Sequence, residues 1–395
     1  MNIKRLGEFA EIQTGPFGSQ LHKEDYVLNG TPIVTVEHLG NRLFTEQNLP
    51  RVSDDDKQRL SKYILSEGDI VFSRVGSVDR CSYVDESHDG WMFSGRCLRV
   101  RPDKTVLPLY LYYYFCLEET KQFVRNIAVG ATMPSINTKL MSEVPVSIPE
   151  IESQQRIADI LSSIDNKIEL NETINENLEQ QAAAYFHHQF IANADPSWKE
   201  GAISDLGTVV GGSTPSKSKP EYYTDNGIAW ITPKDLSADK SKFILHGADD
   251  ITELGLKNSS ASVMPAGTVL FSSRAPIGYI AIADGEVTTN QGFKSVVPNS
   301  NIGTAFVYFF LKNALPTIEN MASGSTFKEI SGSAMRTVPA IIPDDESLQE
   351  FADFCEPLFL QQRTLEAENR SLAALRDSLL PKLMSGELDV SDLEL

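Results

Sequence analysis

The stretch that decides the fold is residues 152–186, ESQQRIADILSSIDNKIELNETINENLEQQAAAYF, in a chain of 395 residues. Eight of its positions follow one another at alternating steps of three and four residues, which is the spacing of a coiled-coil seam. These positions are Leu161, Ile164, Ile168, Asn171, Asn175, Leu178, Ala182 and Tyr185. The pattern therefore predicts a long helix whose seam packs against a second helix.

The same seam recurs about 194 residues further along the chain, and Asn175 then corresponds to Asn369. Its other members are Phe354 or Cys355, Leu358, Gln362, Leu365, Leu372 and Leu379. A buried asparagine at a seam position lowers stability but fixes register, because its amide pairs with another polar group. We therefore predict that Asn175 and Asn369 set the coiled-coil register. The alternative is a pair of solvated helices that happen to contain asparagine.

The segments between the helices repeat as well. At the same offset Gly130 matches Gly324, Ile136 matches Ile330, and Pro145 matches Pro339. The stretch 67–74, which ends on Arg74, is answered by 266–274, which ends on Arg274. The chain is therefore an internal duplication with an α+β architecture, made of two mixed α/β domains and two long helices. We place the first domain at residues 1–150, a central helical region at 151–195, the second domain at 196–343 and a distal helical region at 344–395.

The charge distribution bears on whether the chain binds nucleic acid. The net charge of −19 divides into −3 for residues 1–150, −6 for 151–195, −1 for 196–343 and −9 for 344–395. The helical regions carry most of the negative charge, so each nearly neutral domain can gather basic side chains on one face. Because no strongly basic stripe is present, we expect a partner to supply part of the positive field that DNA requires.

Other functional classes find no support in the sequence. No run of eighteen apolar residues and no signal-peptide core occur, so we expect a soluble, cytoplasmic chain without a membrane partner. The four cysteines form no C-x-x-C pair, which indicates neither a zinc site nor a disulfide framework. The stretch 211–218 lacks the second glycine of a phosphate-binding loop. No Pro-Pro dipeptide is available for an amino-methyltransferase motif, and no nucleophile–base arrangement is apparent.

Several stretches resemble the specificity (S) subunit of type I restriction–modification enzymes, and the resemblance covers essentially the whole chain. They are 152–161 (ESQQRIADIL), 230–236 (WITPKDL), 271–278 (FSSRAPIG) and 379–386 (LLPKLMSG). The resemblance implies two target-recognition domains joined by two long antiparallel coiled-coil helices. Each domain would read one half of a bipartite, asymmetric site in double-stranded DNA. The loop 75–81 departs from this pattern, because it is one residue longer than its counterpart in the second domain.

The resemblance also implies the partners. The helices would set the spacer between the half-sites and dock methyltransferase (M) subunits, expected to be two, through which restriction (R) subunits would join. S-adenosylmethionine, ATP and magnesium would then belong to those subunits, and this chain would be a non-catalytic specificity subunit without a cofactor or metal of its own. The rival hypothesis is a duplicated coiled-coil adaptor that binds proteins and no DNA, which the isoelectric point of 4.8 favours.

Candidate DNA-binding residues are polar or basic side chains in loops that leave strand ends. Arg74 and Arg274 can bond guanine or clamp a phosphate, although either could instead form a structural ion pair. Asn290 and Gln291 suit adenine, although they could cap a turn. Phosphate contacts in the second domain are expected from Ser213, Thr214, Lys217 and Lys219, although this loop could be a plain flexible turn. Lys234 and Lys328 are further DNA-binding candidates of this domain. The first-domain candidates are Thr14, Ser19, Lys23, Arg96, Thr132 and Lys139. The tyrosines at 112–114 are interpreted as core rather than as a base-stacking platform.

Overall fold

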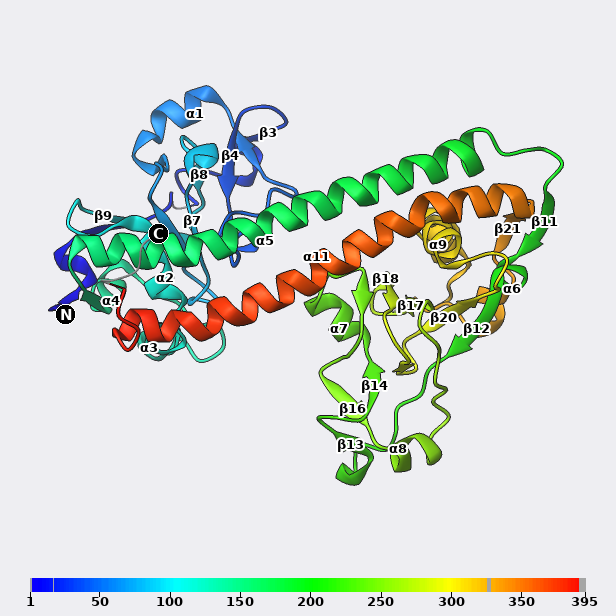
Figure 1. The fold of residues 1–395 in the computed structure, drawn as a ribbon. Helices are drawn as coiled ribbons and strands as arrows, with labels where there is room; N and C mark the ends of the chain where they lie inside the picture. The colour runs from blue at the N-terminus through cyan, green and yellow to red at the C-terminus, as the bar shows by residue number, and fades with distance from the viewer. Residues whose placement is uncertain (1, 17, 325–327, 391–395) are drawn as a thin grey trace. The chain divides into compact units, whose positions relative to one another are not determined.

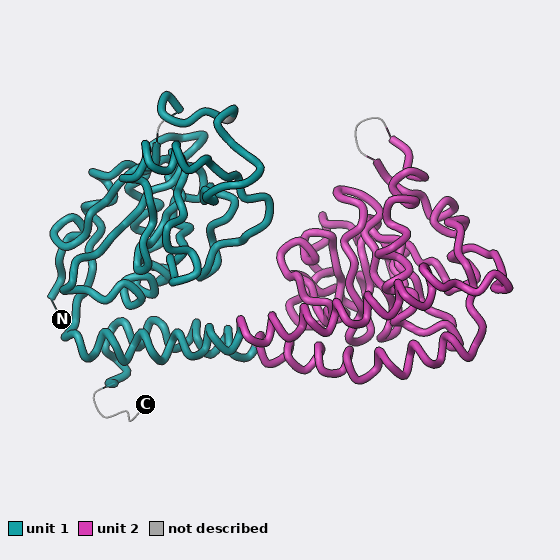
Figure 2. The backbone as a smooth tube through the Cα atoms, turned by 90° about the horizontal axis from the view of Figure 1, so that it is seen from above, with its two compact units in different colours: residues 1–168, 371–395 teal, residues 169–370 magenta. Residues whose placement is uncertain are grey.

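The computed structural model describes residues 2–16, 18–324 and 328–390, and for Lys23 it describes the backbone alone. The chain divides into two compact units, residues 1–168 with 371–395 and residues 169–370, which are drawn in teal and magenta in Figure 2. Each unit contains one globular domain and a segment of each long helix. The duplication predicted from the sequence therefore reappears as two units of similar construction.

The described residues of the first unit form three sheets. Its sheets have the strand orders β1-β10, β2-β9-β6-β7 and β3-β5-β4-β8. The strands are β1 Asn2–Arg5, β2 Ala10–Thr14, β3 Tyr26–Val27, β4 Thr31–Val34, β5 Arg51–Val52, β6 Ile70–Ser73, β7 Cys81–Tyr83, β8 Met92–Phe93, β9 Cys97–Pro102 and β10 Pro145–Ile148. The helices of the domain are α1 Asp54–Arg59, α2 Pro108–Cys116, α3 Glu118–Ile127 and α4 Thr138–Met141.

The second unit repeats these sheets in the orders β11-β21, β12-β20-β17-β18-β15 and β13-β16-β14-β19, with β15 as an additional edge strand. Its strands are β11 Lys199–Ala202, β12 Gly207–Gly211, β13 Tyr223–Thr224, β14 Ile228–Ile231, β15 Phe243–Ile244, β16 Asp249–Ile251, β17 Val269–Ser273, β18 Ile277–Ala283, β19 Thr288–Thr289, β20 Lys294–Pro298 and β21 Pro339–Ile342. Its short helices are α6 Ile203–Leu206, α7 Pro233–Ala238, α8 Glu253–Lys257 and α10 Gly332–Arg336, and the long α9 covers Thr304–Met321.

The central strand of each domain explains where the cores lie. All four residues of β6 are buried. Alternate side chains of a strand point to opposite faces of its sheet. Accordingly, Ile70 and Phe72 pack with the helices, whereas Val71 packs with the sheet β3-β5-β4-β8. In the second domain Phe271 and Leu270 divide in the same way. Each domain is therefore built of two cores on either side of one buried strand.

The long helices are α5, Ile151–Phe186, and α11, Asp345–Ser385 (Figure 1). A turn of π-helix, His187–Ala192, follows α5. In the first unit Arg376 on α11 bonds Asp165 on α5 at 2.8 Å, and Arg156 bonds the Val390 carbonyl beyond α11. In the second unit Tyr185 stacks on Phe354 with ring centroids 4.5 Å apart. Residues later in α5 contact residues earlier in α11, so the two helices are antiparallel in both units.

The seam asparagines do not pair with the partners that the sequence offset suggests. Asn171 is fully buried and donates from Nδ2 to Asn369 Oδ1 at 2.8 Å. Asn175 instead offers its backbone carbonyl to Gln362 Nε2 at 3.0 Å. An offset of constant size finds equivalent positions of a duplication, whereas contact partners in an antiparallel pair approach one another along the sequence. Asn369 therefore pairs with Asn171 and not with Asn175.

The aromatic segment after Pro108 forms two helices, α2 and α3. Proline does open α2 at its first turn, but Leu117 adopts an extended backbone that ends α2 and precedes α3. The core interpretation of the tyrosines is confirmed for Tyr112 and Tyr113, which are 6% and 1% exposed. Among the described residues, no helix is long and apolar enough to cross a membrane.

Candidate DNA-recognition edges

In the second domain, loops from distant parts of the chain converge at one edge, which we call the second loop edge. It comprises 211–219, 231–234, 273–276, 289–294, 323–324 and 328–330. Backbone hydrogen bonds hold these loops together. Ser213 N donates to Thr289 O at 2.9 Å, Asn290 N to Ile231 O at 3.0 Å, and Ile330 N to Ser273 O at 3.1 Å. Side chains from separate loops are therefore brought onto a common framework.

The first domain has a corresponding first loop edge, which comprises 14–16, 18–20, 34–36, 74–77, 94–97 and 129–136. Gly15 N donates to Cys97 O at 3.2 Å, Ser94 N to Val34 O at 2.8 Å, and Ile136 N to Arg74 O at 3.0 Å. The bonds of Ser94 with Val34 and of Ile136 with Arg74 correspond to those of Asn290 with Ile231 and of Ile330 with Ser273 in the second domain, whereas the Gly15 bond joins different segments from the Ser213 bond. The frame is thus conserved between the two copies, while the loop sequences differ.

A glycine occupies the same tight place in each edge. A Cβ on Gly212 would lie 2.1 Å from the Asn290 carbonyl oxygen, and a Cβ on Gly15 would lie 2.1 Å from the Ser94 carbonyl oxygen. Moving either carbonyl away would cost free energy, since both carbonyls belong to loops that are fixed by further hydrogen bonds. The close approach explains why both loops begin with glycine after their first sheet strand.

Arg274 lies at the end of β17, as predicted, but it has an acidic neighbour. Its Nη1 is 3.5 Å from Glu329 Oε2, and Lys294 Nζ is 3.8 Å from Glu329 Oε1. Burial lowers the pKa of Lys294, whereas the Glu329 carboxylate acts in the opposite direction. The ion-pair alternative therefore describes Arg274 in the free chain. Lys294, three residues after Gln291, was not among the candidates predicted from the sequence.

The amide candidates divide into a turn residue and an exposed residue. Asn290 Oδ1 accepts a hydrogen bond from Gly292 N at 2.8 Å, so its side chain caps the turn. Gln291 is exposed, and its Oε1 accepts a hydrogen bond from the Thr214 hydroxyl. Ser213 is fixed from behind, because its carbonyl accepts the indole hydrogen of Trp230 at 3.0 Å. Thr214 and Gln291 are therefore the polar pair that the structure brings together at the surface.

The remaining lysine candidates of the second domain are exposed. Lys217 and Lys219 lie on the loop after β12, and Lys219 Nζ is 5.4 Å from the ring centroid of Tyr222. Lys234 lies on α7, directly after β14, and Lys328 lies beside the segment 325–327, which the structure does not describe. The loop after β12 leads into a short 3-10 helix, Pro220–Tyr222, rather than a long helix, so no phosphate-binding P-loop forms.

The first-domain candidates are more dispersed. Arg74 donates from Nη1 to Gly95 O at 2.9 Å, and its N–H donates to Arg96 O at 2.8 Å. Thr14 is half-buried at the end of β2, whereas the other described candidates are exposed, with Lys139 on α4 outside the loop edge. These exposed residues are Ser19, Arg96, Thr132 and Lys139. The side chain of Lys23 lies outside what the structure describes.

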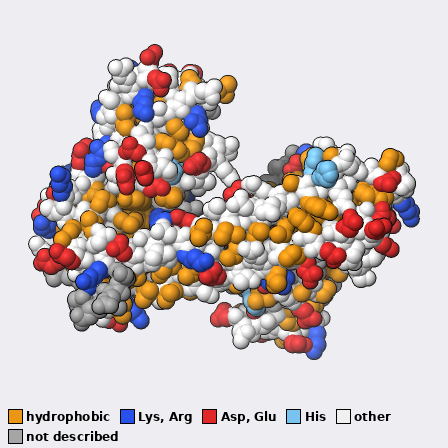
Figure 3. All heavy atoms as spheres, turned by 45° about the horizontal axis from the view of Figure 1, so that its top comes forward, with side chains coloured by type: hydrophobic (Ala, Val, Ile, Leu, Met, Phe, Trp, Pro, Cys, Tyr) orange, Lys and Arg blue, Asp and Glu red, His pale blue; other side chains and the backbone are white. Residues whose placement is uncertain are grey.

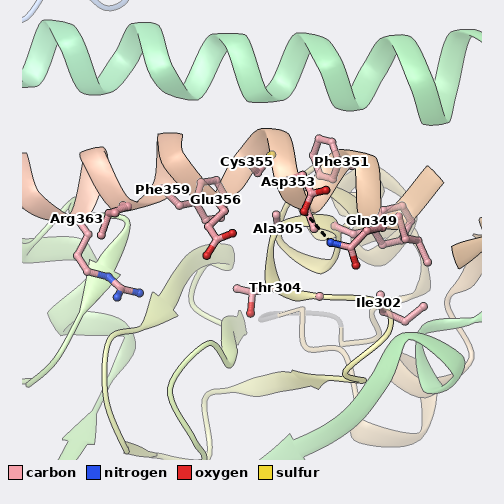
Figure 4. A pocket seen from close by; sticks show the side chains of 15 residues that line it. Ile302, Thr304, Ala305, Gln349, Phe351, Asp353, Cys355, Glu356, Phe359 and Arg363 are labelled. Atoms are coloured by element: carbon pink, nitrogen blue, oxygen red, sulfur yellow. Dashed lines mark hydrogen bonds between the residues drawn. The ribbon is translucent and has the colours of Figure 1, made fainter. Parts of the chain in front are cut away.

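In the second unit, a groove of about 470 Å³ is lined by residues of α11 and by residues at the start of α9. Ile302, Phe359 and Leu360 line it together with Asp353 and Glu356, as Figure 4 shows for the labelled residues. Apolar side chains also gather on the face drawn in Figure 3. The groove thus combines apolar surface with carboxylates.

Residues that could hold a metal are not gathered in the described part of the chain, where no group of three or more histidines, cysteines, aspartates or glutamates forms a candidate site. The four cysteines are free thiols. What each domain does present is a rigid frame with polar loops at one edge. This is the construction of a binding module whose loops carry recognition.

Comparisons with known proteins identify the class. The family model of the type I restriction modification DNA specificity domain matches residues 1–180 and again residues 196–374. The HindI specificity subunit of Haemophilus influenzae is 25% identical over 97% of this chain and 100% of its own length. The MjaIX specificity subunit of Methanocaldococcus jannaschii is 38% identical over 42% of this chain and 39% of its own length.

A solved structure supports the same fold. The S subunit of a type I restriction–modification system from M. genitalium superposes with a TM-score of 0.58 at 17% identity, covering 97% of this chain and 95% of that one. The chain therefore belongs to the type I restriction modification DNA specificity family. Within that family it is a DNA sequence-specificity subunit.

Proposed function

We propose that the two domains each read one half of a bipartite, asymmetric site in double-stranded DNA, and that the paired helices fix the spacer between the halves. The observation that carries this proposal is the pair of equivalent loop edges, which share a hydrogen-bonded frame but differ in loop sequence. Two unlike readers on two like frames suit a site with two different halves. The catalytic work is then done by other subunits.

Methyltransferase (M) subunits, expected to be two, would dock on the helices, and restriction (R) subunits would join through them. Leu170 and Leu360, each more than half exposed on α5 and α11, support this docking, as does the groove beside α9. The acidic helical regions would favour a basic partner surface. S-adenosylmethionine, ATP and magnesium would be supplied by those subunits.

The decisive experiment maps adenine methylation in cells that express the chain with its M subunit, against cells that express M alone. A new bipartite motif with one fixed spacer is expected only when the chain is present. A stable complex with M that produces no new motif would favour the adaptor hypothesis instead.

Salt dependence tests the loop edge directly. Replacing Lys217 and Lys219 by alanine should reduce the slope of log affinity against log salt by about two, because each phosphate contact contributes about 0.9. The loss should be equal for all sequences, since phosphate contacts carry no sequence information. Lys199, on β11 outside the loop edge, serves as the control, and Lys199→Ala should leave the slope unchanged. An unchanged slope in the double variant would remove these lysines from the DNA contact.

A further inference from the structure

Among the described residues of the first domain no strand corresponds to the edge strand β15, and the residue before β15 makes an unusual set of contacts. Lys242 belongs to the sheet of the domain, because Ile282 N donates to its carbonyl at 2.7 Å and β15 pairs with β18. Its side chain leaves the domain and is buried between α5 and α11, with only 7% of the residue exposed. One residue thus joins the second domain to both helices.

The contacts of the ammonium group reach both helices. Lys242 Nζ is 2.6 Å from Glu179 Oε2 on α5 and 2.9 Å from Gln362 Oε1 on α11. It also lies 3.5 Å from the ring centroid of Phe359. Gln362 in turn donates to the Asn175 carbonyl on α5, so the lysine sits where the helices are already joined to each other.

The backbone of the same segment is held independently. The N–H groups of Lys242 and Phe243 donate to the two carboxylate oxygens of Glu366 on α11, at 2.7 and 3.0 Å. A carboxylate that receives two successive N–H groups has one favourable orientation, so this bond fixes direction as well as distance. The side-chain and backbone contacts together leave the segment one way to lie on the helices.

Glu179 is shared with the domain's own helix. Its other oxygen accepts from Lys312 Nζ at 2.5 Å and from the Tyr308 hydroxyl at 3.2 Å, both on α9. Burial lowers the pKa of Lys242 to about 8, while the Glu179 carboxylate works against that shift. A buried charged lysine is a costly way to gain stability, and such groups are better explained when they select one arrangement over others.

The first unit places a basic residue at the equivalent position. Tyr83 N donates to the Arg42 carbonyl at 2.7 Å, as Ile282 does to Lys242, and Arg42 Nη2 donates to Asn166 on α5 at 2.6 Å. The surrounding loop sequences of the two domains differ. A basic side chain that passes from the domain to a long helix therefore recurs in both copies.

We propose that Lys242 is a positioning residue that fixes the orientation of the second recognition domain on the helix pair, and so restricts the spacer that the chain accepts. This inference rests on the proposed function. A domain that can swing on the helices would meet its half-site at neighbouring base-pair positions, which lie 3.4 Å apart along one strand. A domain that is held at both helices would meet its half-site at a single position.

The test uses the full chain with its M subunit and genome-wide adenine methylation as the readout. Lys242→Met keeps the length and apolar stem of the side chain but removes the charge. We expect both half-site sequences to persist, while methylation at spacers one base pair shorter or longer rises at least about tenfold relative to the wild type, the scale of one base-pair mismatch. Glu366→Gln, which weakens the backbone contact, should relax the spacer in the same direction.

The matched control is Lys312→Met, since Lys312 on α9 also bonds Glu179 but has a side chain that is 40% exposed. It should keep the wild-type spacer. Folding is checked by thermal unfolding, and Glu366→Gln provides the test if Lys242→Met does not fold. An unrelaxed spacer in the folded variants, or an altered half-site sequence, overturns the positioning role. A wild-type chain that yields no bipartite motif overturns the proposed function and this inference with it.

Discussion

Replacing Asn171 by alanine should loosen the helix pair locally in the unit formed by residues 169–370. Asn171 is fully buried, and its Nδ2 donates to Asn369 Oδ1 and to Glu368 Oε2, both at 2.8 Å. Alanine removes both hydrogen bonds and leaves the Asn369 carbonyl without this donor. The neighbouring seam positions Ile168, Leu365 and Leu372 are apolar and offer the amide of Asn369 no equivalent partner.

The magnitude follows from the two bonds. A neutral amide–amide bond contributes about 1 kcal/mol, and a bond to a half-exposed carboxylate contributes about 1.5 kcal/mol. Alanine is a better helix former than asparagine by about 0.6 kcal/mol, which offsets part of the loss. We therefore expect the free energy of local opening to fall by about 2 kcal/mol, equivalent to about thirtyfold faster exchange of protected amides.

Amide hydrogen exchange is the appropriate assay, since a chain of this size need not unfold in one step. The faster exchange should be confined to the turns of α5 and α11 around Asn171 and Asn369. In a double-mutant cycle with Asn369→Ala, the coupling energy should be about 1 kcal/mol. Asn175→Ala is the control, because the bond of Asn175 to Gln362 uses its backbone carbonyl and survives the substitution. A larger effect from Asn175→Ala, or zero coupling between Asn171 and Asn369, would refute the pairing.

Two further predictions concern the second domain. Gly212→Ala should displace the Asn290 loop, with a cost of about 1–3 kcal/mol, and should degrade the second half-site in the methylation motif while the first stays intact; Gly15→Ala should have the reverse effect. Lys242 has a folded-state pKa of about 8 against 10.5 for an ordinary lysine, so the unfolded state binds more protons between these values and the free energy of unfolding should rise with pH there. Relative to Lys242→Met, the wild type should gain about 2 kcal/mol between pH 7.5 and 9.5 in denaturant titrations, and a flat or falling difference would contradict the shifted pKa.

Much of the fold was predictable because its long helices and its duplication leave regular patterns in the sequence. The three-four spacing of the seam located α5 and α11 to within one residue at their starts. The constant offset revealed the duplication. The pairing of β1 with β10, and of β11 with β21, was not predicted, because it joins segments about 140 residues apart and leaves no periodic signal. The break at Leu117 was not predictable from the sequence, because no glycine or proline marks it.

The site was predictable in its general place and less so in its detail. The predicted strand ends drew attention to Arg274 and Gln291, because strand ends carry loops. The sequence could not show that Glu329 lies beside Arg274, since the two residues are far apart in the chain and meet only in the fold. Lys242 was not predicted, because it directly follows a polar stretch, Ala238-Asp239-Lys240-Ser241, whose composition is typical of a solvated loop. A buried lysine is recognisable only from the carboxylate and ring that surround it.

The antiparallel helices also explain why the compact units do not follow the sequence repeat. In each unit, the end of one long helix and the start of the other together cover the core of the domain. In the first unit Leu383 and Met384 on α11, together with Val390 beyond it, join a core that contains Leu6 from the chain's first turns. In the second unit Phe186 near the end of α5 packs beside Phe351 near the start of α11. The duplication is therefore one of sequence, while each folded unit is assembled from both repeats and contains a segment of each long helix.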